Sequence, residues 1–142
     1  MNNVQILYPI LAMVALTFIV AGVMLRRRVK AMKQKRIHPQ KTAMSAQMAA
    51  LIEDTRASDN FRNLFETPVL FYAAIVTIYA TKLPVGTYVT LAWIYVAARY
   101  AHSYLQCGPN VVMRRFYAFL TSMVTLLIMW IVLALDLFTA KL

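Results

Sequence analysis

Charge is scarce in this sequence of 142 residues, because only 14% of them are Asp, Glu, Lys or Arg while 61% are hydrophobic. Soluble domains carry about a quarter charged residues and are close to half apolar, so an ordinary water-soluble domain is excluded. The single cysteine, Cys107, excludes a disulfide within the chain and leaves the redox compartment open. The histidine, cysteine and acidic residues show no convincing metal-ligand spacing, so we expect no metal site.

The charge that is present is strongly basic, with a formal net charge of +10. Such a balance raises the question of nucleic acid as a partner, which we reject. Ten of the fifteen Lys and Arg residues lie between Arg26 and Arg62, between two apolar stretches. A basic cluster beside a membrane span is explained by the positive-inside rule, and it can also contact anionic lipid headgroups.

Long apolar stretches predict an all-α membrane protein with a single four-transmembrane-helix up-down bundle over 1–142. The first stretch is charge-free and would reach about 31 Å as a helix, enough to cross a bilayer. Its basic residues follow it instead of preceding it, so we interpret it as a retained helix and not a cleaved signal peptide. Arg26 to Arg28 should end this span abruptly. The predicted spans are about 5–25, 61–81, 87–105 and 111–138, with a basic loop over 26–60.

Proline and helix-capping residues refine the boundaries of the predicted helices. His38-Pro39 predicts a break in the basic loop, because the residue before proline is disfavoured in helix. A short helix or an extension of the second span is expected within about 42–57. Pro68 should kink the second span unless a helix begins there. Three residues are plausible N-caps of that span: Ser58, Asp59 and Asn60.

The distribution of Lys and Arg also predicts orientation. The basic loop over 26–60 and the turn over 106–113, which precedes two more arginines, fall on the same side of an up-down bundle. By the positive-inside rule this side is cytoplasmic and both termini lie outside.

Charged residues near bilayer depth usually face the protein interior, a partner or water. Arg62 and Glu66 are four apart, and Asn63 and Glu66 are three apart, so we expect their side chains to converge on one helical face. The alternative is a polar cluster that only ties helix ends together.

A second polar stripe follows in the third span, where Arg99, His102 and Gln106 recur at helical spacing. The alternative is that Arg99 reaches the headgroups while His102 sits in the interface. Arg114 and Arg115 point about 100° apart on a helix, so one can face the bundle. An arginine in a partly dry pocket would clamp an anion or a thiolate, although topology control alone also explains the pair.

The motif Arg62-Asn63-x-x-Glu66, continued by Thr67-Pro68, and the later Arg99-x-x-His102 with a basic pair opening the fourth span resemble the MAPEG family, the membrane-associated proteins in eicosanoid and glutathione metabolism. The resemblance covers about 55–138 and is greatest to bacterial members, which implies an inner-membrane location.

The resemblance implies a homotrimer of four-helix bundles that binds glutathione between neighbouring subunits at the cytoplasmic side. An enzyme of this kind would use the glutathione thiolate to attack a lipophilic electrophile or reduce a hydroperoxide. Arg115 matches the thiolate-stabilising arginine. The residues that match the family's glutathione pocket are Arg62, Asn63, Glu66, Arg99 and His102.

Three positions depart from the active eicosanoid-type members of that family. Asp59 stands where they have an arginine, and Gln106 and Phe119 stand where they have tyrosines. These differences favour the alternative that the chain is a non-catalytic member that binds lipid or a partner. A small multidrug/proton exporter is a further alternative, but Glu66 lies near a helix start and not deep in a span.

Overall fold

The computed structural model describes residues 3–42 and 44–139, so residues 1–2, 43 and 140–142 of the predicted domain lie outside the described residues. Within those ranges the chain is helical and contains no strand. The elements in chain order are η1 (Asn3–Leu7), α1 (Tyr8–Gln34), η2 (Pro39–Thr42), α2 (Ser45–Leu51), α3 (Arg56–Asn63), α4 (Pro68–Thr81), α5 (Gly86–Cys107) and α6 (Val112–Thr139).

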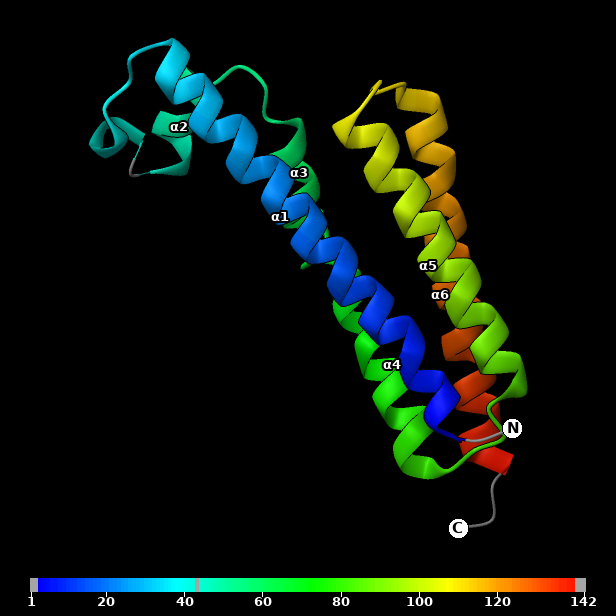
Figure 1. The fold of residues 1–142 in the computed structure, drawn as a ribbon. Helices are drawn as coiled ribbons and strands as arrows, with labels where there is room; N and C mark the ends of the chain where they lie inside the picture. The colour runs from blue at the N-terminus through cyan, green and yellow to red at the C-terminus, as the bar shows by residue number, and fades with distance from the viewer. Residues whose placement is uncertain (1–2, 43, 140–142) are drawn as a thin grey trace.

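The long helices run up and down (Figure 1), with α1 and α4 on one side and α5 and α6 on the other. The first and last described residues lie at one end of the bundle, which we call the terminal end. The connections 35–55 and 108–111 lie at the opposite end, the connection end. The up-down arrangement expected from the sequence is therefore confirmed.

Three helical stretches are long and apolar enough to cross a membrane: Asn3–Gln34, Arg56–Thr81 and Val112–Thr139. The further helix α5 packs along α6 and is less apolar because its inner face carries polar residues. Large apolar side chains cover the outer surface, as at Phe18, whose side chain is 74% exposed. Apolar surface on this scale belongs to a lipid-facing protein, and the chain is an all-α integral membrane bundle.

The interior of the bundle is apolar in its middle. Met13 and Leu16 of α1, Ile75 of α4 and Met129 of α6 are buried there. The rings of Phe71 in α4 and Tyr95 in α5 stack with centroids 4.4 Å apart. Stacked rings of this kind add to the burial of their apolar area, and they fix α4 against α5 just below the polar residues of the connection end.

The first helix is longer than the sequence predicted. Arg26 to Arg28 do end the apolar span as expected, but the helix α1 continues through them to Gln34, into the stretch predicted as a loop. Arg, Lys, Ala, Met and Gln are all good helix formers, so the arginines end the apolar span without ending the helix. The break does come before His38-Pro39, and the short helix expected in the connection is α2.

The second predicted span is divided. Helix α3 ends at Asn63, residues 64–67 form turns, and α4 begins at Pro68. Proline suits a first helical turn, where its missing N–H leaves no bond unmade, so a helix start at Pro68 is the outcome and not a kink. The three proposed caps were wrong because they lie inside α3, whose N-cap is Thr55.

Candidate functional site

A buried arginine organises the connection end. The Arg99 side chain is 0% exposed. It therefore lies inside the bundle and does not extend outward to the headgroups, which was the alternative. Its Nη2 donates to Asn63 Oδ1 at 2.6 Å and to the Asn63 carbonyl at 3.3 Å. Its Nε and Nη1 are buried without a hydrogen-bond partner among the described residues. A buried guanidinium with free donors is costly, which is typical of a functional site.

His102 links α5 to the start of α6. Its Nδ1 lies 3.2 Å from the Arg115 carbonyl, and its Nε2 lies 2.8 Å from Gln106 Oε1. A carbonyl only accepts, so Nδ1 carries a proton and a neutral ring accepts at Nε2. The side-chain amide of Gln106 can donate this hydrogen bond when its oxygen and nitrogen exchange places, so that the NH₂ group faces Nε2. The stripe predicted on α5 is confirmed, since Arg99, His102 and Gln106 are all buried.

His102 and Gln106 border a pocket of about 280 Å³ at the connection end. It lies between the end of α3, the last turns of α5 and the first turns of α6. Its polar lining is Asn63, His102, Gln106 and Arg115, and its apolar lining is Val112, Phe116 and Phe119. A pocket with apolar walls and a few convergent polar groups is the usual form of a small-molecule site.

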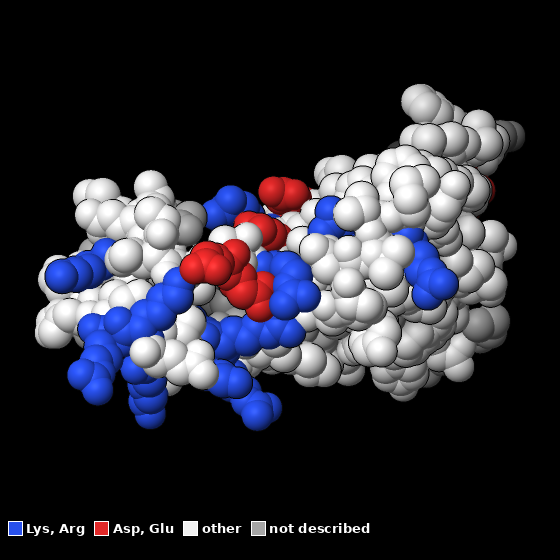
Figure 2. Space-filling model, turned by 90° about the horizontal axis from the view of Figure 1, so that it is seen from above, with Lys and Arg blue, Asp and Glu red and all other residues white. Residues whose placement is uncertain are grey.

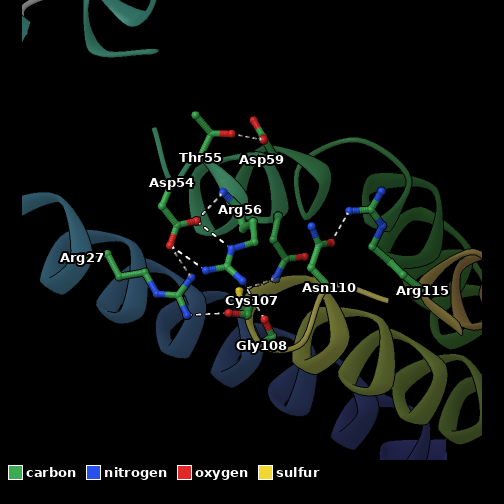
Figure 3. A network of polar contacts seen from close by, with 10 residues as sticks. Arg27, Asp54, Thr55, Arg56, Asp59, Cys107, Gly108, Asn110 and Arg115 are labelled. Carbon is green, nitrogen blue, oxygen red and sulfur yellow. Dashed lines mark hydrogen bonds and ion pairs between the residues drawn. The ribbon is translucent and has the colours of Figure 1, made fainter. Parts of the chain in front are cut away.

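Arg115 is the cation of this pocket. It is half-buried, whereas Arg114 is exposed, so the two diverge as their helical spacing predicted. Arg115 Nη1 donates to Asn110 Oδ1 at 2.8 Å (Figure 3). Asn110 adopts a positive φ of 51° in the turn between α5 and α6, a conformation that asparagine tolerates better than most residues. A neutral amide therefore holds the guanidinium and leaves its charge available.

Arg62 and Glu66 do not join this pocket. Both side chains are exposed, and Arg62 borders a separate cavity on the other side of α3. The expectation that Arg62, Asn63 and Glu66 share one helical face was wrong because α3 ends at Asn63 and Glu66 follows in the turns before Pro68. Of the six residues predicted for the site, three line the pocket (Asn63, His102, Arg115), and Arg99 lies behind them.

Sequence reasoning missed a second polar cluster beside the pocket (Figure 3). Arg56 donates through Nε and Nη2 to both carboxylate oxygens of Asp54, at 2.8 and 3.0 Å, and through Nη1 to the Gly108 carbonyl at 2.8 Å. Arg27 of α1 donates to the same Asp54 and to the Cys107 carbonyl. We call these residues the clasp, because they tie α1 and the long connection to the turn after α5.

Cys107 ends α5 beside the clasp. It is half-buried, and Asn60 donates to its sulfur at 3.3 Å while accepting from Ser103 at 3.2 Å. This placement fits a small, largely apolar side chain that fills space near a helix end. No pattern in the sequence brings Asn60 and Cys107 together, because they lie 47 residues apart on different helices.

Charge is unevenly spread over the connection end. Figure 2 shows Lys and Arg side chains gathered at one side of the molecule and the carboxylates in a group beside them. Four of the five acidic residues come from the segment 53–66. The guanidinium of Arg56, bonded to Asp54, holds the pKa of that carboxyl below its usual value, and the bond from Lys35 does the same for Glu53.

Comparison with known proteins gives one match, to a family model. Neither curated proteins nor solved structures give a match. A family model does match, over residues 6–135, which includes all the helices that build the pocket. The chain therefore belongs to the MAPEG family.

Proposed function

We propose that the chain is a glutathione-dependent transferase or peroxidase that acts on lipophilic electrophiles. One observation carries the proposal: the half-buried guanidinium of Arg115 faces a mostly apolar pocket and is held by a neutral amide at 2.8 Å. A cation in such surroundings favours an ionised thiol. A thiolate there would attack an electrophilic carbon of a substrate supplied from the bilayer, forming a C–S bond as the leaving group departs or the strained ring opens. With a hydroperoxide it would attack the terminal oxygen and break the O–O bond, releasing the alcohol and leaving a glutathione sulfenic acid that a second glutathione converts to the disulfide and water.

The proposal assigns roles to the remaining residues. Asn63, oriented by Arg99, and His102 would contact the polar parts of glutathione. The assembly would be a homotrimer with glutathione between neighbouring subunits, so that Arg62 and Glu66, exposed on the single chain, would face a pocket shared with a neighbour. The connection end would lie in the cytoplasm of a bacterial cell, with both termini outside the inner membrane.

Thiolate formation tests the proposal directly. Glutathione added to the purified protein in detergent at neutral pH should give a saturable thiolate signal in ultraviolet difference absorbance. Arg115→Ala should abolish that signal because the stabilising cation is lost, while Arg114→Ala, next to it but exposed, should keep it. A signal that survives Arg115→Ala would contradict the assigned role.

A non-catalytic member that binds lipid or a partner is the second candidate. Gln106 and Phe119 favour it, because they line the pocket and supply no phenolic hydroxyl to a thiol. Absence of a thiolate signal at millimolar glutathione, together with lipid that copurifies with the protein, would support this function instead.

A further inference from the structure

The part of α1 beyond the apolar span carries basic residues on two different faces. On the inner face, Arg27 pairs with Asp54 at 3.3 Å, and Lys35, directly after the last residue of α1, pairs with Glu53 at 2.7 Å. On the outer face, the side chains of Arg26, Lys30 and Lys33 are exposed. Among the described residues these three cations have no hydrogen-bond or ion-pair partner. The carboxylates of the connection thus neutralise one face and leave the other charged.

The charged outer face borders an open groove of about 520 Å³. Its apolar lining, which we call the floor, is Gly22, Leu25 and Val29. Its polar lining, which we call the rim, is Arg26, Lys30, Lys33 and Gln34. A Cβ placed on Gly22 would meet no atom within 4 Å, so the floor is open to the surroundings. At 1.5 Å rise per residue, the groove extends about 16 Å along the helix.

The groove crosses the edge of the bilayer, since the apolar span of α1 gives way to arginine at residue 26. Gly22 and Leu25 therefore lie at the depth of lipid acyl chains. The stretch from Arg26 to Lys33, which includes Val29, lies at the depth of the headgroups. Three unpaired cations in this region attract a phosphate.

We propose that this groove is a binding site for one anionic phospholipid, with an acyl chain against Gly22 and Leu25, the glycerol end of the lipid beside Val29, and the phosphate between Arg26, Lys30 and Lys33. The site is separate from the pocket around Arg115 and does not depend on glutathione chemistry. Binding there would fix the projecting end of α1, from which the clasp residue Arg27 reaches the turn after α5.

Native mass spectrometry tests the proposal with phosphatidylglycerol and phosphatidylcholine of identical acyl chains. The wild-type protein should retain phosphatidylglycerol selectively. Each basic residue at an anionic surface contributes a factor of about five, so Lys30→Gln/Lys33→Gln should weaken retention roughly 25-fold. Arg36→Gln/Lys41→Gln removes the same charge from exposed positions outside the groove and should retain the lipid.

The apolar floor needs its own variant. Gly22→Leu fills the groove and improves helix propensity, so it should weaken lipid retention without unfolding α1. Equal loss of bound phosphatidylglycerol in Lys30→Gln/Lys33→Gln and in Arg36→Gln/Lys41→Gln would overturn the proposal, because diffuse positive charge would then explain lipid retention. A disulfide-linked dimer formed by Gly22→Cys, and absent from the wild type, would also overturn it by showing that a second copy covers this face.

Discussion

Arg99 links α5 to the end of α3 at the connection end. Its guanidinium is fully buried, and its only hydrogen-bond partner among the described residues is Asn63. Burying a charge is tolerated when it is hydrogen-bonded and becomes costly when a partner is removed. Asn63 therefore stabilises the fold through Arg99 and at the same time faces the pocket.

Replacing Asn63 should test this dependence. Asn63→Ala leaves the Arg99 guanidinium without its 2.6 Å bond, which should lower the free energy of unfolding by about 2–3 kcal/mol, as expected for a hydrogen bond to a buried charge. Thermal unfolding in detergent measures the loss. Arg62→Ala removes the neighbouring exposed side chain and should change stability little.

A double variant separates the lost bond from other effects of the substitution. Asn63→Leu/Arg99→Met removes both polar partners and should recover much of the stability, because no charge is then left buried. If Asn63→Ala unfolds at the wild-type temperature, Arg99 finds another partner and the argument fails.

Residues on a single helix were predictable, and pairs across helices were not. The stripe of Arg99, His102 and Gln106 follows from spacing along one helix, and the structure confirms it. The bond between Arg99 and Asn63 joins residues 36 apart, and no helical period relates them. The sequence therefore identified Asn63, Arg99, His102 and Arg115, but it did not identify the partners that they contact on other helices.

At the scale of elements, the hairpin of α5 and α6 is held at both of its ends. The connection end has the contact of His102 with the Arg115 carbonyl. At the terminal end, the Tyr88 hydroxyl donates to Asp136 Oδ2 at 2.6 Å. These two contacts fix the start and the end of the long packing interface between the helices, and so position Arg115 relative to the residues of α5.

Removing the Tyr88 hydroxyl should loosen this hairpin at the terminal end. Tyr88→Phe leaves the Asp136 carboxylate without its donor and should cost about 1.5–3 kcal/mol of stability, the range for a hydrogen bond to a charged group. Thermal unfolding compared with Tyr79→Phe checks this, since Tyr79 is 43% exposed. Equal melting temperatures for the two variants would show that the bond contributes nothing.

The division between α3 and α4 shows what hydrophobicity cannot predict. The apolar stretch 61–81 reads as one span, yet the chain makes turns at 64–67 before Pro68. Pro68 lacks the N–H that would bond the Leu64 carbonyl in a continuous helix. The break directs Asn63 toward Arg99 and leaves Glu66 exposed, so one proline decides which motif residues reach the pocket.

At the scale of the whole molecule, the clasp joins α1, the long connection and the end of α5 through polar contacts. Asp54 is its centre, because Arg27 and Arg56 both bind its carboxylate and each also donates to a carbonyl of the turn after α5. The long connection is thereby fixed beside both the pocket and the projecting end of α1. Loss of one carboxylate charge should release all of these contacts together.

The clasp should consequently be acid-sensitive. The bond from Arg56 lowers the pKa of Asp54 in the folded state below the ordinary value of 3.8. A carboxyl with a depressed pKa stabilises the fold above its unfolded pKa, and that stability is lost as pH falls through the folded pKa. Protection of the segment 52–56 in hydrogen exchange should therefore be constant from neutral pH to about pH 4 and fall below it.

Asp54→Asn supplies the matched control for this pH dependence. It keeps the shape of the side chain but removes the charge, so the segment 52–56 should already be less protected at neutral pH. Acid should loosen it less than the wild type, because only Glu53, paired with the exposed Lys35, is left to titrate in this segment. Because the Asp54 side chain is 38% exposed, added salt should weaken the wild-type clasp in the same direction. Loss of protection on acidification that is identical in Asp54→Asn would mean that another group titrates and that Asp54 does not control the connection end.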